Sequence, residues 1–199
     1  ETEVEEESDI EEIFADPRIL KKHPKWGKYP HVRQNDLMDC GPACLAMISQ
    51  YWGNTLPIQF WRQKLQTNQL GTTMFDLANT AEKFGFITHP VGIKDVGDLD
   101  ENHLPAIALR MYHYVVIYEV SSKHVVVGDP SYAVKTMTHE EFNKGFENAV
   151  LLIKPTEDFM EHKSPRSEYK HYLKLTMGFR KELGIIMAIS VLMVGLALF

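Results

Sequence analysis

Apolar residues recur with the spacing of a buried helix face in residues 40–52. Leu45, Ile48 and Trp52 fall at positions i, i+3 and i+7, which places them on one side of a helix. Gly53 then marks the end of this helix, because glycine readily adopts the conformation that closes one. Asp39 precedes the segment and is expected to be its N-cap.

Capping residues indicate two more helices. Thr73 with Asp76 predicts a helix over residues 73–84, and Thr138 with Glu141 predicts a short helix that begins there. Runs of β-branched and aromatic residues predict strands at about 86–92, 104–111, 113–120, 123–128, 133–137 and 149–154. Helices lead and strands dominate the second half, so the predicted fold class is α+β.

The C-terminal end carries an apolar run, 183–199, in which no residue is charged. A run that is apolar on every side has no polar face for water, which favours a membrane span over a buried core helix. At about 1.5 Å per residue these 17 residues are slightly shorter than a hydrocarbon core of about 30 Å. We therefore expect the start of a first transmembrane helix, truncated at Phe199.

Basic residues crowd the segment just before this run. Residues 156–182 form a predicted juxtamembrane segment, and from residue 162 onward it holds six lysines and arginines against two glutamates. Basic residues beside a transmembrane helix favour the cytoplasmic side. The chain ahead of the run is therefore expected in the cytoplasm, and the basic segment is expected to contact anionic lipid rather than nucleic acid.

The net charge of −6 averages unlike parts of the 199-residue chain. Residues 1–16 hold nine of the 27 acidic residues and no basic one, which leaves 18 acidic against 21 basic residues elsewhere. Such a charge run is typical of a solvated segment, so residues 1–30 are predicted to be a flexible acidic head and linker. The folded domain is expected at residues 31–155, and two cysteines exclude a disulfide scaffold for it.

Cys40 is the first candidate for chemistry, because it lies at the start of the first predicted helix. Free backbone N–H groups and the helix dipole at that end favour a thiolate over a thiol, whose ordinary pKa is about 8.5. The charge of Asp39 next to it opposes this effect. Position alone therefore leaves a buried structural cysteine as the alternative.

A nucleophilic cysteine needs a base, and the base needs an orienting group. His113 opens the apolar strand HYVVIYEV, which turns at Ser121 and Ser122 into KHVVVGDP. A hairpin with a three-residue loop places Asp129 opposite His113 or one diagonal step away, on the same face of the sheet. A two-residue loop would place them on opposite faces, and a surface histidine at a strand start is the alternative.

Gln34 precedes Cys40 by six residues and is the third candidate. In acyl transfer to a thiolate, a side-chain amide beside the nucleophile can hold the developing oxyanion together with a backbone N–H at the helix start. Taken alone, a solvated loop glutamine is the simpler interpretation of Gln34.

Together these residues resemble the motifs of the C39 peptidases, the N-terminal cytosolic domains of bacterial ABC exporters that process and secrete bacteriocins and related peptides. The run QNDLMDCGPACLAMISQYWG at 34–53 resembles their cysteine motif. Their histidine, aspartate and connecting-helix motifs are matched by HYVVI at 113–117, Asp129-Pro130, GTT at 71–73 and AEKFGF at 81–86. The resemblance covers about residues 31–155, with three separated motifs in the same order.

The resemblance implies a papain-like α+β fold in which Cys40 is the nucleophile and His113 is the general base. It also implies that Asp129 orients His113 and that Gln34 supplies the amide of the oxyanion hole. The implied reaction is hydrolysis of the peptide bond after a Gly-Gly or Gly-Ala pair that ends a leader peptide. The implied chemistry needs no metal or other cofactor.

The resemblance further implies partners outside this chain. The leader of a precursor peptide is expected to bind as an amphipathic helix in an apolar groove, for which Met74, Phe75 and Tyr112 are candidates. The GxxxxGK[ST] phosphate loop is absent, so ATP is expected only in a nucleotide-binding domain beyond Phe199. The implied setting is a homodimeric exporter in the bacterial cytoplasmic membrane, with the peptidase domain on the cytoplasmic side. The 33 residues before Gln34 suggest an added N-terminal region.

Other hypotheses remain beside this one. Cys44 could pair with Cys40 as metal ligands or as a disulfide, but there is no second ligand pair at zinc spacing and a cytoplasmic setting disfavours a disulfide. We therefore expect Cys44 in the core. The rival function is a non-proteolytic docking domain that recruits substrate, a class that typically lacks the nucleophilic cysteine. A membrane-anchored cysteine peptidase without a transporter is a third hypothesis.

Overall fold

The computed structural model describes residues 19, 29–65, 67, 71–161 and 179–197. The chain divides into one unit of residues 1–164 and another of residues 165–199, and each is described by itself. The acidic head and most of the basic juxtamembrane segment lie outside the described residues, so what was expected of them stays a prediction.

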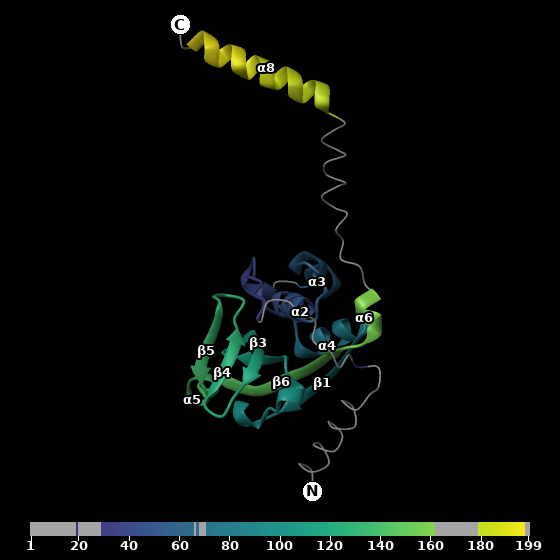
Figure 1. Cartoon of the computed structure of the whole chain (residues 1–199), viewed down its shortest axis with the longest axis vertical. Coiled ribbons are helices and arrows are strands. Elements are labelled where there is room, and N and C mark those ends of the chain that lie inside the picture. Colours follow the sequence, from purple (N-terminus) through teal and green to yellow (C-terminus); the bar gives the residue numbers. More distant parts are fainter. Residues whose placement is uncertain (1–18, 20–28, 66, 68–70, 162–178, 198–199) are drawn as a thin grey trace. The chain divides into compact units, whose positions relative to one another are not determined.

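An antiparallel sheet of six strands forms the centre of the first unit, in the order β1-β6-β2-β3-β4-β5 (Figure 1). The strands are β1 (Phe86–Gly92), β2 (Ala106–Arg110), β3 (His113–Val120), β4 (His124–Gly128), β5 (Val134–Thr138) and β6 (Phe146–Pro155). Each lies where a strand was predicted, and only the ends differ, by up to three residues. With the helices that pack against the sheet, they confirm the α+β class.

The described residues of this unit form the helices η1 (Leu37–Asp39), α2 (Cys40–Tyr51), α3 (Ile58–Leu65), α4 (Met74–Lys83), η2 (Val96–Asp98), η3 (Glu101–His103), α5 (His139–Asn143) and α6 (Glu157–Glu161). The predicted capping boxes are present at Thr73 and Thr138, whose hydroxyls accept from the backbone N–H three residues on. Helix α3 was not predicted, although its buried residues Ile58, Trp61 and Leu65 have the same helical spacing that identified α2.

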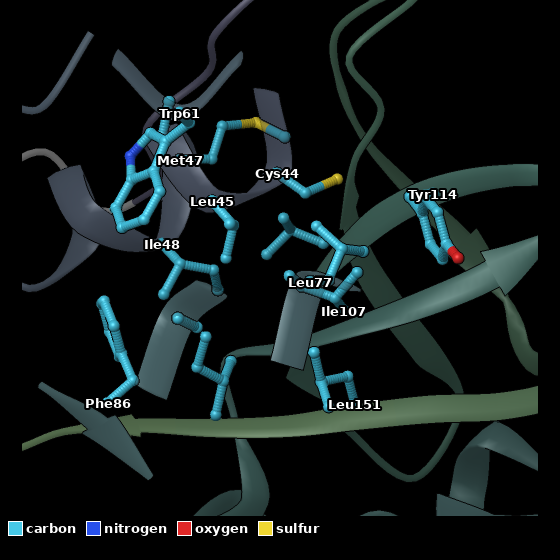
Figure 2. Close-up of a cluster of buried hydrophobic side chains, with 14 of the residues drawn as sticks. Cys44, Leu45, Met47, Ile48, Trp61, Leu77, Phe86, Ile107, Tyr114 and Leu151 are labelled. Carbon is cyan, nitrogen blue, oxygen red and sulfur yellow. The ribbon is translucent and has the colours of Figure 1, made fainter. Parts of the chain in front are cut away.

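Helix α2 packs against β3 of the sheet and against helices α3 and α4, and α4 also packs on β1. Every residue from Gly41 to Ser49 is buried, so α2 is a central helix and not one with a single buried face as predicted. Figure 2 shows Leu45 and Ile48 of α2 in one cluster with Trp61 of α3 and with Leu151 of β6. This burial fixes the start of α2, where Cys40 lies, to a rigid support.

The two faces of the sheet bury separate clusters. Val116 on β3 belongs to the cluster around α2, whereas its neighbours Val115 and Ile117 belong to a second cluster that includes Phe142 of α5. This alternation is the two-residue period of a strand that is buried on both faces. At the far end of the first cluster, the ring of Phe159 in α6 lies 4.2 Å from that of Phe86, so packing extends beyond the expected boundary at residue 155.

The second unit contains helix α8 (Arg180–Ala197), which covers most of the apolar run at the C-terminal end. Large apolar side chains along it are exposed, among them Ile186, Met187 and Val191. Among the described residues, no helix combines the length and the apolar character needed to cross a membrane. The transmembrane assignment of residues 183–199 therefore stays a prediction.

Candidate active site

Cys40 is the first residue of α2 and follows the turn η1 directly. Burial would raise the pKa of its thiol, but hydrogen bonds with the side chain of His113 and with the backbone N–H of Tyr114 outweigh burial and lower that pKa below its ordinary value. The backbone N–H of Gly41 acts in the same direction, as expected at the start of a helix. The environment of Cys40 therefore favours a thiolate.

His113 lies between Cys40 and Asp129. Its Nε2–H donates to Asp129 Oδ1 over 2.9 Å, which leaves Nδ1 for the thiol of Cys40. Burial would lower the pKa of His113, but the hydrogen bonds with Asp129 and Cys40 raise it to about 9. Burial would raise the pKa of Asp129, but hydrogen bonds from His113 and from the Ser131 N–H lower it. The three side chains therefore form a Cys-His-Asp arrangement that stabilises a thiolate beside an imidazolium.

A bulge in the β3–β4 hairpin brings His113 and Asp129 together. Of the two loop lengths considered, the hairpin has the two-residue one, formed by Ser122 and Lys123. That register alone would place the two side chains on opposite faces of the sheet. The register shifts by one residue near Tyr118, which restores the same-face pairing before the strands reach the site. The contact is thus present with the two-residue loop, which had been expected to keep the two side chains apart, and not with the three-residue loop from which it was inferred.

The segment of residues 30–34 is held against the turn that follows β4. His31 Nε2–H donates to the Asp129 carbonyl over 2.8 Å, and the Gln34 N–H donates to the Pro130 carbonyl over 3.0 Å. The hydroxyl of Tyr118 donates to the carbonyl of Pro30 at the start of this segment. The backbone of Gln34 is therefore fixed beside the turn that carries Asp129.

One atom of the Gln34 side chain has no hydrogen-bond partner in the part of the chain that the structure describes. Its Oε1 is buried and accepts no hydrogen bond from the described residues. An oxyanion accepts hydrogen bonds from the amide N–H groups and not from this oxygen. The role inferred for Gln34 therefore stays a prediction.

Asp39 occupies the N-cap position of α2, as predicted, but its side chain makes no capping hydrogen bond. Its backbone has φ −90° and ψ 7°, away from the extended conformation of an N-cap, because η1 continues directly into α2. Its buried carboxylate instead accepts from Arg62 Nη1 over 3.3 Å, and Arg62 also lies 3.8 Å from Asp36. This ion pair holds α3 against the turn that precedes Cys40.

Cys44 lies one helical turn beyond Cys40 and is fully buried, as predicted. Burial raises the pKa of its thiol well above the ordinary value. In the part of the chain that the structure describes, no three His, Cys, Asp or Glu side chains are grouped closely enough to hold a metal ion. Cys44 is therefore a core residue, which Figure 2 shows among its apolar neighbours.

Two of the three residues expected to line the leader groove are exposed. Tyr112, next to His113 in the two-residue β2–β3 turn, is 92% exposed, and Phe75 in the first turn of α4 is 73% exposed. Met74, the third groove candidate, is partly buried against the core. Tyr112 has φ 58°, a left-handed conformation that is unfavourable for a bulky residue and is often found at functional sites.

Sequence reasoning missed three residues that contact the site. His31 contacts the carbonyl of Asp129, Arg62 pairs with Asp39 and Asp36, and Ser131 contacts both His113 and Asp129. Their positions follow no spacing rule within one helix or strand, so no local pattern identified them.

The Peptidase C39 family model matches residues 28–158. The chain is 32% identical over 134 residues to the lactococcin-G-processing and transport ATP-binding protein LagD of Lactococcus lactis subsp. lactis, covering 64% of this chain and 19% of that protein. It is 29% identical over 171 residues to the pediocin PA-1 transport/processing ATP-binding protein PedD of Pediococcus acidilactici, covering 81% of this chain and 23% of that protein. The chain thus spans less than a quarter of the length of these relatives.

Solved structures share the fold. The peptidase domain of Streptococcus ComA, a bi-functional ABC transporter, is 30% identical with a TM-score of 0.57, covering 64% of this chain and 99% of that domain. A double glycine motif protease from an AMS/PCAT transporter, solved in complex with the leader peptide, has a TM-score of 0.59 at 22% identity. The match covers 69% of this chain and 97% of that protease. The second likeness shows the fold alone.

Proposed function

Since the chain belongs to the peptidase C39 family, we propose that it is the peptidase part of an exporter and cleaves a leader peptide after a Gly-Gly or Gly-Ala pair. The family consists of cysteine peptidases, as the sequence motifs indicated. The observation that carries the proposal is the contact of His113 with both Cys40 and Asp129 at the open end of α2. The relatives named above process and transport peptides, and their transport functions would require residues outside this chain.

The first step of the proposed reaction is attack by the Cys40 thiolate on the carbonyl carbon of the second small residue. The carbonyl π bond opens and places a negative charge on its oxygen. We assign stabilisation of this oxyanion to the side-chain amide of Gln34 and a backbone N–H at the start of α2. The imidazolium of His113 then gives its Nδ1 proton to the leaving amine, and the C–N bond breaks.

The second step releases the leader. Neutral His113 takes a proton from water, and the resulting hydroxide attacks the thioester carbonyl of Cys40. The C–S bond breaks and restores the thiolate beside the imidazolium. Asp129 keeps the Nε2–H tautomer throughout, so that Nδ1 faces the reacting atoms.

The leader would bind on the apolar surface beside this site. Leu37, Phe75 and Tyr112 are exposed by more than 70% of their surface, and each lies in or next to an element that carries a site residue or packs against α2. An amphipathic helix covers such side chains with its apolar face. We therefore assign Phe75 and Tyr112 to the leader surface and leave Met74 to the core.

The same proposal includes the setting of the enzyme. Residues 183–199 would begin the first transmembrane helix, with the peptidase domain on the cytoplasmic side of a bacterial membrane. The exporter would be a homodimer, with ATP bound in a nucleotide-binding domain that this chain does not include. The exposed apolar side chains of α8 support the first of these statements.

A non-proteolytic docking domain is the second candidate function, and one experiment separates the two. The 199-residue chain in detergent is incubated with a synthetic leader peptide that ends in Gly-Gly followed by a short cargo sequence. Cleavage after the second glycine by the unaltered chain, with leader binding but no cleavage by Cys40→Ala, is the expected result. Binding without cleavage by the unaltered chain would establish the docking function instead.

A further inference from the structure

We propose that Ser131 is a positioning residue of the active site, whose hydroxyl and backbone N–H hold His113 and Asp129 in their reactive alignment. The inference rests on the proposed function for its meaning, but its test does not depend on peptide cleavage. Ser131 belongs to none of the motifs that identified the site.

Three polar atoms meet at one edge of the His113 ring. Ser131 Oγ lies 3.3 Å from Nε2, and Asp129 Oδ1 lies 2.9 Å from the same nitrogen. Because Nε2 donates its proton to the carboxylate, it cannot also accept one from the serine. The hydroxyl oxygen therefore accepts a share of the same N–H and becomes a second acceptor for the imidazole.

The backbone of Ser131 acts on the other partner. Its N–H donates over 2.8 Å to Oδ1 of Asp129, the same oxygen that accepts from His113. This carboxylate oxygen consequently has two donors, which restrict its rotation and favour the ionised form. Ser131 thus contacts both members of the pair, one through its side chain and one through its backbone.

The turn between β4 and β5 presents Ser131 in this position. The Asp129 N–H donates to the Ala133 carbonyl and the Tyr132 N–H donates to the Asp129 carbonyl, each over 3.1 Å. His31 holds the same turn from outside the sheet through its own bond to the Asp129 carbonyl. The position of Ser131 is therefore set by the fold.

The hydroxyl favours the imidazolium because a positively charged N–H makes the stronger hydrogen bond. The charged and titratable groups that face the pair are Cys40 and Cys44 of α2, Tyr114 of β3, Lys135 of β5, and His31, which contacts the Asp129 backbone. Removing the hydroxyl changes none of them. Loss of the Ser131 hydroxyl should lower the pKa of His113 and raise that of Cys40. The pH range in which the thiolate and the imidazolium coexist should therefore become narrower at both ends.

The test measures the rate at which iodoacetamide alkylates Cys40 in the 199-residue chain from pH 4 to pH 10, by mass spectrometry of the Cys40 peptide. The rate rises where the thiolate forms and changes again where the imidazolium of His113 loses its proton, and Ser131→Ala is expected to move these two midpoints toward each other by about half a pH unit each. Ser131→Thr keeps a hydroxyl and is expected to restore the unaltered profile. Ser122→Ala, in the β3–β4 turn, is the matched control.

Two results would overturn the assignment. One is a Ser131→Ala profile that superimposes on that of the unaltered chain while thermal unfolding is unchanged. The other is a Ser131→Thr profile that shifts as far as that of Ser131→Ala, which would exclude the hydroxyl as the cause. If the unaltered chain forms no thiolate at Cys40 below pH 8, the proposed function fails and not merely this inference.

Discussion

The first and second turns of α2 each carry a cysteine, and the two thiols have opposite properties. Cys40 meets His113 and backbone N–H groups at the open end of the helix, which lower its pKa. Cys44, four residues on, is enclosed by apolar side chains that raise its pKa. Residue type and helix are the same in both cases. The reactivity of a thiol is therefore decided by whether polar partners offset the cost of burial.

The largest expected effect separates the two cysteines by activity. Cys40→Ala should lower leader cleavage at least about 1,000-fold, because no other group forms the acyl-enzyme. Cys44→Ala should keep activity within about threefold, since Cys44 contacts only the core. Both variants are compared by mass spectrometry of the cleaved leader. Loss of cleavage in a folded Cys44→Ala variant would transfer the role of nucleophile to Cys44.

A smaller loss is expected at the oxyanion donor. Gln34→Ala should lower kcat about 100-fold with little change in KM, because the amide acts on a charge that develops only in the transition state. The alkylation rate of Cys40 should stay unchanged, since Gln34 is not among the groups that shift its pKa. Gln50→Ala, at the other end of α2, is the matched control. A parallel fall in alkylation would show that Gln34 supports the thiolate and not the oxyanion.

The difference between the first and second turns of α2 also shows how much of the structure can be predicted from the sequence. Local rules identified α2, the capped start of α4 and the strand that begins at His113, because each depends on neighbours within one element. They also predicted that Asp129 lies near His113. That prediction assumed a three-residue loop, whereas the hairpin has a two-residue turn and a bulge. A bulge has no reliable sequence signature, so the correct contact followed from a wrong register at the turn.

Tertiary partners account for the remaining differences. Asp39 fits the residue preference of an N-cap, yet its carboxylate pairs with Arg62 from a helix that was not predicted. His31 and Ser131 reach the site from the segment of residues 30–34 and from the turn before β5. Such contacts depend on how separate elements meet in space, which the spacing within each element does not contain.

The pH dependence of cleavage tests the cause of the difference between the thiols. Since the pKa of His113 is raised to about 9, the imidazolium that stabilises the Cys40 thiolate is present below that pH and lost above it. kcat/KM should therefore fall about tenfold per pH unit above about 9. On the acidic side, activity should fall below the lowered pKa of Cys40. A basic limb near 6.5, the ordinary pKa of histidine, would contradict the contact between His113 and Asp129.

A few-fold effect is expected at the residue that holds the Asp129 turn from outside. His31→Ala removes the hydrogen bond to the Asp129 carbonyl. The variant should lower kcat about threefold to tenfold, because a small displacement of Asp129 and Gln34 would weaken their interactions with His113 and with the oxyanion. His31→Gln retains a donor and should recover most of the loss. His89→Ala, on β1, serves as the control for removal of a histidine. Equal activities for His31→Ala and His89→Ala would remove His31 from the site.

The smallest expected effect concerns stability. Here substitution of Cys44 should have the larger effect, whereas for activity substitution of Cys40 has the larger effect. Cys44→Ser places a hydroxyl among apolar side chains and should lower the free energy of unfolding by about 1–3 kcal/mol. Cys40→Ser lies at a half-buried helix start where the hydroxyl keeps polar neighbours, so its change should stay within about 0.5 kcal/mol. Urea unfolding monitored by tryptophan fluorescence measures both. The variant that loses catalysis should thus keep its stability, and the variant that keeps catalysis should lose stability. Equal destabilisation by the two substitutions would mean that Cys40 is packed like a core residue, which would remove the contrast between the two turns of α2.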